Sequence, residues 1–212
     1  TGATVGYLTE AANTVGAQWV GAMPTAEGLN AAQMLAGGLR CALLLNTEPQ
    51  WDSAVGAQAV AALGKVDMVI TMSPFKANME FSDVLLPIAP FTETSGSFIN
   101  AEGRVQSFHA VVKPLGETRP GWKILRVLGN LLGLSNFDFE TSQEILTKAV
   151  NVPSGGLLDM STRRVQAQTL TSPAQAGEPV VASIYQLDGI VRRAASLQLT
   201  VDARLASGEV PA

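Results

Sequence analysis

Three short apolar runs constrain the fold of this chain more than any other feature. They are CALLLN at 41–46, VDMVITMS at 66–73 and VLLPIA at 84–89. Continuous apolar runs of this length are typical of strands that are buried on both faces. The segment 51–64 is long enough for a helical crossover, and a short turn or helix over 76–81 precedes the third run. This order predicts an α/β fold with a mostly parallel sheet flanked by helices.

Helical periodicity marks the sequence between and around these runs. Apolar side chains recur at spacings of three and four over 4–18 and 119–134, and shorter helices are expected over 28–36 and 140–150. The apolar face of 119–134 is wide, so we expect it to be buried against the sheet or against a neighbouring domain.

Local signals refine the ends of these elements. Proline has no N–H to donate to a strand ladder, so the third strand should end at Pro87 or lie at an edge of the sheet. The pair Gly37-Gly38 should stop the helix before it. Thr141 or Ser142 should cap the helix over 140–150.

The sequence changes character after residue 150. It is loop-like over 151–180, and over 181–212 it is ambiguous and partly extended. We therefore expect an α/β domain over 1–150 and a loop-rich extension over 151–212 that packs on it. The chain begins without Met and directly on helix-like sequence, which we interpret as a piece of a longer chain.

Charge and hydrophobicity exclude two classes of function. The chain has 212 residues, 47% of them hydrophobic, and a net charge of −4, and its clusters of basic residues are the pairs Arg163-Arg164 and Arg192-Arg193. Nucleic-acid binding by a basic face is therefore not expected. Apolar runs also stay below the roughly 18 residues that a membrane helix needs, so no membrane insertion is expected.

Too few soft ligands are present for a metal centre. The chain has one cysteine, Cys41, and one histidine, His109. Iron–sulfur clusters and structural zinc sites each need about four such ligands, so we predict no metal ligands and no catalytic residues in this chain. We interpret Cys41 as a buried apolar residue and His109 as a structural, hydrogen-bonded side chain.

The loop after the third run offers one candidate site. Consecutive amides and hydroxyls over 94–97 could cradle a pyrophosphate, and Arg104 could close that cradle with a bidentate contact. An ordinary turn, with Glu102 paired to Arg104 or capping a neighbouring element, is the other interpretation, and it is favoured because turn composition is common. Neither GxGxxG nor GxxxxGK[ST] occurs in the sequence.

The stretch SDVLLPIAPFTETSGSFINAEGRVQ at 82–106 resembles a motif of the molybdopterin oxidoreductase superfamily. In that motif ADVVLPAA is followed by a small-residue turn and by N.EGR.Q. The matching residues here are Asp83, Val84, Leu86, Pro87, Glu93, Gly96, Asn100, Glu102, Gly103, Arg104 and Gln106. LRCALLLNTEP at 39–49 resembles a strand and turn that often ends in GENP, and it departs from the pattern by lacking the glycine.

Other stretches resemble one branch of the superfamily, the G subunit of bacterial NADH-quinone oxidoreductase (respiratory complex I). They are LTEAANTVGA, AAQMLAGGLRCALLLNTEP and IVRRAASLQLTVDARLA. This resemblance implies a fold like that of formate dehydrogenase and a pterin site that holds no cofactor. It also implies that 4Fe-4S and 2Fe-2S clusters belong to a preceding part of the parent subunit. The vestigial cofactor-binding candidates are then Thr94, Gly96, Asn100, Glu102, Gly103, Arg104 and Gln106.

The function implied by the resemblance is a scaffold portion of the proton-translocating NADH:quinone oxidoreductase, inactive alone and without a redox centre of its own. Its partners would be the other peripheral-arm subunits and the preceding part of the same chain, on the cytoplasmic face of the bacterial inner membrane. The alternative is a fragment of an active molybdopterin-dependent, formate dehydrogenase-like oxidoreductase. A weaker third interpretation is a free-standing nucleotide-binding α/β domain.

Overall fold

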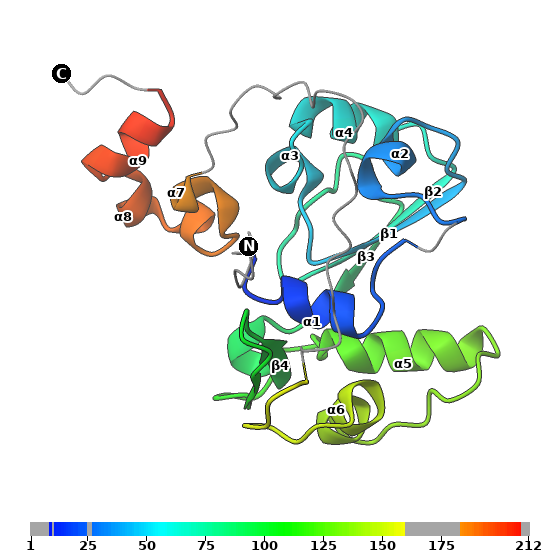
Figure 1. The fold of residues 1–212 in the computed structure, drawn as a ribbon. Coiled ribbons are helices and arrows are strands. Elements are labelled where there is room, and N and C mark those ends of the chain that lie inside the picture. Colours follow the sequence, from blue (N-terminus) through cyan, green and yellow to red (C-terminus); the bar gives the residue numbers. More distant parts are fainter. Residues whose placement is uncertain (1–8, 10, 25–26, 160–182, 209–212) are drawn as a thin grey trace, which may run out of the picture.

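A parallel sheet of three strands lies at the centre of the molecule (Figure 1). The computed structural model describes residues 9, 11–24, 27–159 and 183–208. The strands are β1 (Cys41–Leu45), β2 (Met68–Ser73) and β3 (Val84–Pro87), paired in the order β1-β2-β3. The structure therefore confirms the predicted α/β class with a parallel sheet and flanking helices.

The middle strand, β2, is the most deeply buried part of the sheet. Val69, Thr71 and Met72 have no exposed surface. The hydroxyl of Thr71 shares a hydrogen bond of 2.7 Å with that of Ser82, so its burial leaves no unpaired polar group. Strand β3 pairs with β2 at one edge of the sheet. It ends at Pro87, as the missing N–H of proline predicts.

Strand β1 departs from the prediction that it is buried on both faces. Ala42 packs with Leu63 and Val69 on one face, whereas Leu43 and Leu45 remain 44% and 46% exposed. Cys41, predicted to be buried, is also exposed. The reason is position: among the described residues β1 is an outer strand of the sheet and pairs only with β2.

The crossover between β1 and β2 contains two helices where the sequence suggests one. Helix α3 (Pro49–Asp52) ends at Ser53, and α4 (Gly56–Leu63) follows it. Ala59 and Leu63 turn inward from α4. Trp51 and Val55 are exposed.

Helix α2 (Ala31–Leu35) precedes the sheet and has a capping box. The side chain of Asn30 accepts from the N–H of Gln33, and the side chain of Gln33 accepts from the N–H of Asn30. Gly37 follows it at φ 119°, a conformation that favours glycine, so the predicted stop is in place.

A second core forms below the sheet in the orientation of Figure 1. Strands β4 (Gly96–Ile99) and β5 (Val105–Phe108) make an antiparallel hairpin after the short 3-10 helix η1 (Phe91–Glu93), and α1 (Thr14–Trp19) packs against β4. The buried side chains of this core are Ile99, Val105, Leu146, Val150 and Leu158. Helix α1 begins at Thr14, so the helix predicted over 4–18 is confirmed only at its end: residues 11–13 form a bend and a turn, and residues 4–8 and 10 lie outside the described residues.

Helices α5 (Gly121–Leu131) and α6 (Ser142–Val150) are confirmed as predicted. The apolar face of α5 is covered only in part, and Leu131 and Leu132 at its end are 80% and 66% exposed. Thr141 caps α6 by accepting a hydrogen bond from the N–H of Glu144.

The carboxylate of Glu144 in turn accepts from the N–H of Glu140, and this contact lowers the pKa of Glu144 below its ordinary value, with burial opposing it and Thr141 adding to it. Because the pKa is lowered on folding, this contact stabilises the protein above the ordinary pKa of a glutamate. That contribution is lost as the pH falls through the lowered pKa.

The described C-terminal residues are helical, although the sequence suggested partly extended structure. They form α7 (Ile184–Leu187), the 3-10 helix η2 (Val191–Arg193), α8 (Ala195–Gln198) and α9 (Val201–Ala206). In Figure 1 these orange and red elements lie to one side of the sheet, with α7 in contact with α3. The domain division at residue 150 stays a prediction. Of the loop predicted over 151–180, residues 160–180 lie outside the described residues.

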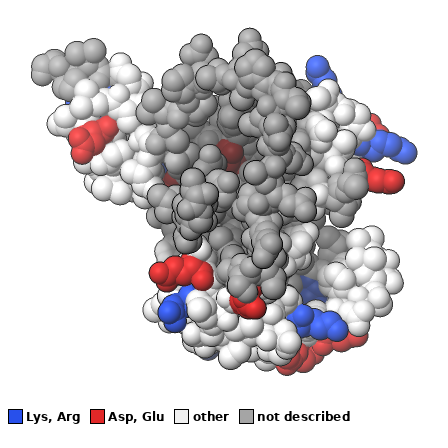
Figure 2. All heavy atoms as spheres, in the orientation of Figure 1, with Lys and Arg blue, Asp and Glu red and all other residues white. Residues whose placement is uncertain are grey.

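Charged side chains on the visible surface are mixed in sign. On the face drawn in Figure 2, acidic and basic groups of the described residues adjoin each other, and neither sign forms a continuous field. Among the described residues, no helix has the length and apolar character needed to cross a bilayer.

The cap of α6 gives a first prediction. Thr141→Ala removes the oxygen that accepts from the N–H of Glu144, so it should lower the free energy of unfolding by about 1 kcal/mol. Ser142→Ala, one residue later, is the control and should change stability little, because Ser142 lies within the helix and is not its cap. Urea denaturation followed by circular dichroism measures both values. Equal effects of the two variants would contradict this account of the cap.

Candidate functional site

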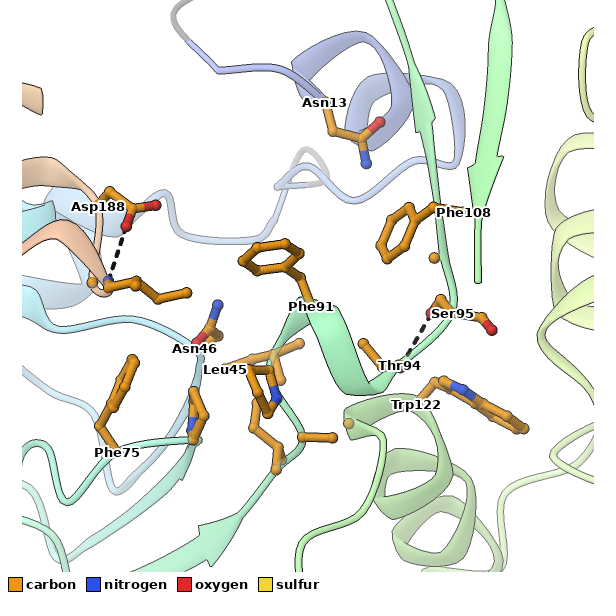
Figure 3. Close-up of a pocket in the computed structure, with 18 of the residues that line it drawn as sticks. Asn13, Leu45, Asn46, Phe75, Phe91, Thr94, Ser95, Phe108, Trp122 and Asp188 are labelled. Carbon is orange, nitrogen blue, oxygen red and sulfur yellow. Dashed lines mark hydrogen bonds between the residues drawn. The ribbon is translucent and has the colours of Figure 1, made fainter. Parts of the chain in front are cut away.

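A cavity of about 700 Å³ lies outside the carboxyl ends of the three parallel strands (Figure 3). Asn46 lines it directly after β1, Phe75 shortly after β2, and Pro90 and Phe91 after β3. Open α/β sheets bind ligands in this position, because the loops that leave neighbouring strands diverge there. We refer to it as the carboxyl-edge cavity.

The opposite wall comes from the hairpin and from α5. Residues 94–97 at the start of β4 line it together with Phe108 of β5 and Trp122 of α5. Figure 3 shows the ring of Phe91 standing between this wall and the strand ends, with Asp188 across the open space from Ser95 and Trp122. Aromatic rings and small hydroxyl side chains therefore surround the cavity.

Hydrogen bonds fix the loops at the strand ends. Asn46 turns the chain out of β1 at φ 50°, and its N–H donates to the carbonyl of Met72 over 2.8 Å. The side-chain amide of Asn78 donates to the carbonyl of Thr47 over 2.9 Å, which ties the loop after β2 to the loop after β1. The positions of the loops at the rim of the cavity are thus fixed by their hydrogen bonds to the sheet and to each other.

The charges that line the cavity are mostly negative. Glu48, Asp52, Asp188 and Arg192 are its charged lining residues. Arg192 is already paired, at 2.9 Å with Glu48 and at 3.1 Å with Asp52. No unpaired cation from the described residues is therefore aimed into this space.

The structure separates the predicted site residues into two groups. Thr94 and Gly96 line the carboxyl-edge cavity. The others lie toward the far end of the β4–β5 hairpin or on β5, and none of them lines the cavity: Asn100, Glu102, Gly103, Arg104 and Gln106. The length of β4 is the cause, because it carries the chain away from the cavity before the second half of the motif begins. Their role as a ligand site stays a prediction.

Asn100 and Gly103 build the turn of the hairpin. The side-chain oxygen of Asn100 accepts from the N–H of Glu102 at 3.1 Å and from that of Arg104 at 2.8 Å. Gly103 adopts φ 84°, and its N–H donates to the carbonyl of Asn100 over 2.9 Å. In the described part of the chain no ion pair joins Glu102 to Arg104. Asn100 and Gly103 of the segment NAEGR therefore have a structural role in the turn.

The earlier acidic residues of the motif also bond to the backbone. The carboxylate of Asp83 accepts from the N–H of Val69 at 2.7 Å, which joins the start of β3 to β2. The carboxylate of Glu93 accepts from the N–H of Leu115 at 2.9 Å. Both contacts hold segments of this chain together.

The hydroxyls of the loop have partners too. The hydroxyl of Thr94 donates to the carbonyl of Ser95 over 3.2 Å, and those of Ser97 and Ser107 share a hydrogen bond of 2.9 Å across the hairpin. Arg104 does not line the cavity, so it does not close a cradle there, and an anion cradle over 94–97 stays a prediction.

Sequence reasoning missed most of the cavity. Phe91, Trp122, Asp188 and the pairing of Arg192 with Glu48 all came from elements that no local motif joins. One signal was available: Glu48 stands in the NTEP turn after the first strand, at the carboxyl edge where loops meet.

Comparison with known proteins fixes the family. Residues 2–131, more than half of the chain, match the family model described as molybdopterin oxidoreductase. The chain belongs to the molybdopterin oxidoreductase family. This confirms the superfamily resemblance that the motif at 82–106 carries.

Curated relatives align over part of this chain. A Staphylococcus aureus (strain bovine RF122 / ET3-1) protein, provisionally named as a formate dehydrogenase, is 36% identical over 87 residues, which is 41% of this chain and 9% of that protein. YjgC of Bacillus subtilis (strain 168), provisionally named as an oxidoreductase, is 36% identical over 93 residues, or 43% of this chain and 9% of YjgC. The aligned region thus spans about a tenth of these relatives.

Among solved structures, acetylene hydratase from Pelobacter acetylenicus matches with a TM-score of 0.44 and 18% identity. The match covers 53% of this chain and 16% of the hydratase.

The family name raises the question of whether a pterin cofactor fits the residues present. Such cofactors carry phosphate groups, which are held by cations and free N–H donors. Among the charged residues described around the cavity, Arg192 is already paired with Glu48 and Asp52, and Asp188 adds a further carboxylate. The described lining residues therefore do not supply the unpaired cation that would hold the phosphate of such a pterin. Among the described residues, no group of three or more His, Cys, Asp or Glu side chains could hold a metal ion.

The turn of the hairpin gives a second prediction. Gly103→Ala places a side chain at φ 84°, so it should lower the free energy of unfolding by about 1 to 2 kcal/mol. Gly64→Ala is the matched control: Gly64 ends α4 at φ −63°, where an added Cβ meets only ordinary contacts, the nearest at 3.5 Å, so stability should hold or rise slightly. Urea denaturation measures both. If Gly103→Ala were as stable as Gly64→Ala, the turn would not depend on the glycine.

Proposed function

We propose that this chain is a scaffold portion of the G subunit of the proton-translocating NADH:quinone oxidoreductase, respiratory complex I. It has no redox centre of its own and supports electron transfer from NADH to quinone within the whole complex. The 4Fe-4S and 2Fe-2S clusters of the parent subunit then belong to a part of the subunit that precedes this chain.

The main support for this proposal is that residues of the family motif form hydrogen bonds that stabilise the fold of this chain. The side chains of Asp83, Glu93 and Asn100 accept hydrogen bonds from backbone N–H groups of this same chain. A side-chain oxygen that stabilises a turn or joins two strands has a structural role before any role in binding a ligand. The ligand count supports the same conclusion, because one cysteine and one histidine in 212 residues fall short of the four ligands that a cluster needs.

Uncovered apolar surface supports a role inside a larger assembly. Val111, Leu115 and Leu131 are each more than three quarters exposed. Isolated soluble proteins seldom leave many large apolar side chains this open, whereas surfaces that meet a partner often do. Within the proposal, the partners are the other peripheral-arm subunits and the preceding part of the same chain, on the cytoplasmic face of the bacterial inner membrane.

A fragment of an active molybdopterin-dependent oxidoreductase, similar to formate dehydrogenase, is the second candidate. One observation favours it: a relative with 36% identity over 87 residues carries a formate dehydrogenase name. The carboxyl-edge cavity also lies where α/β proteins bind ligands. Under this candidate, residues outside this chain would supply the cations that the cavity lacks.

A third prediction separates the two candidates. The chain is tagged in the cell that encodes it, and the assembly that contains it is purified from gently solubilised membranes. We expect an assembly that reduces a quinone with NADH, contains iron, and holds no stoichiometric molybdenum or pterin, as measured by elemental analysis and by fluorescence of the extracted pterin.

The control is the same preparation from cells that carry the tag on an unrelated protein. Formate-dependent dye reduction together with stoichiometric molybdenum and pterin would overturn the scaffold proposal and favour the enzyme. Recovery of the chain outside any assembly would overturn the partner assignment as well.

A further inference from the structure

One wall of the carboxyl-edge cavity is made by a segment far away in sequence. Leu187, Asp188, Gly189, Ile190 and Arg192 line the cavity opposite the hairpin. We call residues 183–193, which contain α7 and η2, the strap. In Figure 1 the strap lies beside α3. Residues of the strap and of α5 both line the cavity.

Two arginines hold the strap to the loop after β1. Arg192 pairs with Glu48 at 2.9 Å and with Asp52 at 3.1 Å, and Arg193 pairs with the other oxygen of Glu48 at 2.8 Å. The side chains of Arg192 and Glu48 are only 11% and 15% exposed, so water screens these pairs weakly. We call this set of ion pairs the clamp.

Aromatic rings back the clamp on both sides. The guanidinium of Arg192 lies 5.4 Å from the centre of the Trp51 ring, and that of Arg193 lies 4.0 Å from the centre of the Phe75 ring. Arginine stacks on such rings by cation–π attraction. Trp51 lies in α3, shortly after β1, and Phe75 lies in the loop after β2, so the clamp attaches the strap to the rim of the cavity.

No residue of the strap belongs to either buried core cluster of the described residues. Ile184, Leu187 and Ile190 keep 63%, 46% and 45% of their surface exposed. The strap also organises itself: the Asp188 carboxylate accepts from the N–H groups of Ile190 and Val191, and Arg192 donates to the carbonyl of Gln186. The strap can therefore leave the rim without unfolding a hydrophobic core.

We propose that the strap is a releasable lid on the carboxyl-edge cavity, closed by the clamp of Arg192 and Arg193 on Glu48 and Asp52. With the clamp closed, the two carboxylates at the rim are neutralised and one side of the cavity is walled. With the clamp open, the strap moves off and the cavity becomes accessible from that side. This inference concerns access to the cavity and does not rest on the proposed function.

Hydrogen exchange followed by mass spectrometry tests the clamp on the 212-residue chain. The double variant Arg192→Gln, Arg193→Gln keeps side chains of similar length and removes both charges. Amides of residues 184–193 should exchange roughly tenfold to a hundredfold faster, while amides of β2 keep their wild-type rates. Arg204→Gln, an arginine of α9 without an ion pair among the described residues, is the matched control and should match wild type.

A thiol in the cavity tests the lid. In a Cys41→Ser background, Ser95→Cys places a thiol on the wall opposite the strap, and Ser207→Cys places one at the exposed end of α9. Labelling by a bulky fluorescent maleimide should speed up roughly tenfold at position 95 when the two arginines are replaced by glutamine. The rate at position 207 should not change.

Three results would overturn the proposal. Wild-type exchange of residues 184–193 in the double variant would mean that the clamp does not hold the strap. Faster exchange of β2 as well would mean that the clamp stabilises the whole fold and not the strap alone. An unchanged labelling rate at position 95 would mean that the strap does not control access to the wall opposite it. The double lysine variant keeps the charges and should fall between wild type and the glutamine variant.

Discussion

The pairing of β2 with a strand on each side is the constraint on which the rest of the molecule depends. Its side chains Val69, Thr71 and Met72 are fully buried, and its N–H and C=O groups join both neighbours. The segments that follow β1, β2 and β3 at the rim of the carboxyl-edge cavity all leave this sheet. The cavity is therefore a consequence of parallel strand order, because three carboxyl ends must meet at one edge.

The arrangement of the sheet could be predicted because its cause is local. Three apolar runs separated by crossover segments leave few topologies, and Pro87 marks the end of one strand by chemistry alone. Exposure was harder to predict: Leu43 and Leu45 look like buried residues, yet they lie on an outer strand. Whether a strand is central depends on which other strands pair with it, and the sequence of the strand alone does not determine this.

The candidate site was even harder to predict from local sequence than the exposure of the strands. Thr94 and Gly96 were found by sequence and line the cavity, but β4 carries Asn100 and its neighbours to the other end of a hairpin. The second half of the motif at 82–106 therefore lies in two separate places, the wall of the cavity and the turn of the hairpin. The clamp could not be found by spacing at all, because Arg192 and Asp52 are 140 positions apart in the sequence. A family motif can be kept for the hydrogen bonds that fold it, and its presence alone does not locate a ligand.

The outer position of β1 has a structural consequence of its own. Within the described residues this strand bonds to β2 along one side, so its opposite backbone edge presents N–H and C=O groups in the spacing of a strand. Such an edge is a template for one more strand. A longer polypeptide could continue the sheet there without disturbing any contact described above, and the half-covered leucines of β1 would gain neighbours in the same step. β1 would then lie inside a broader sheet, with β3 still at its other edge.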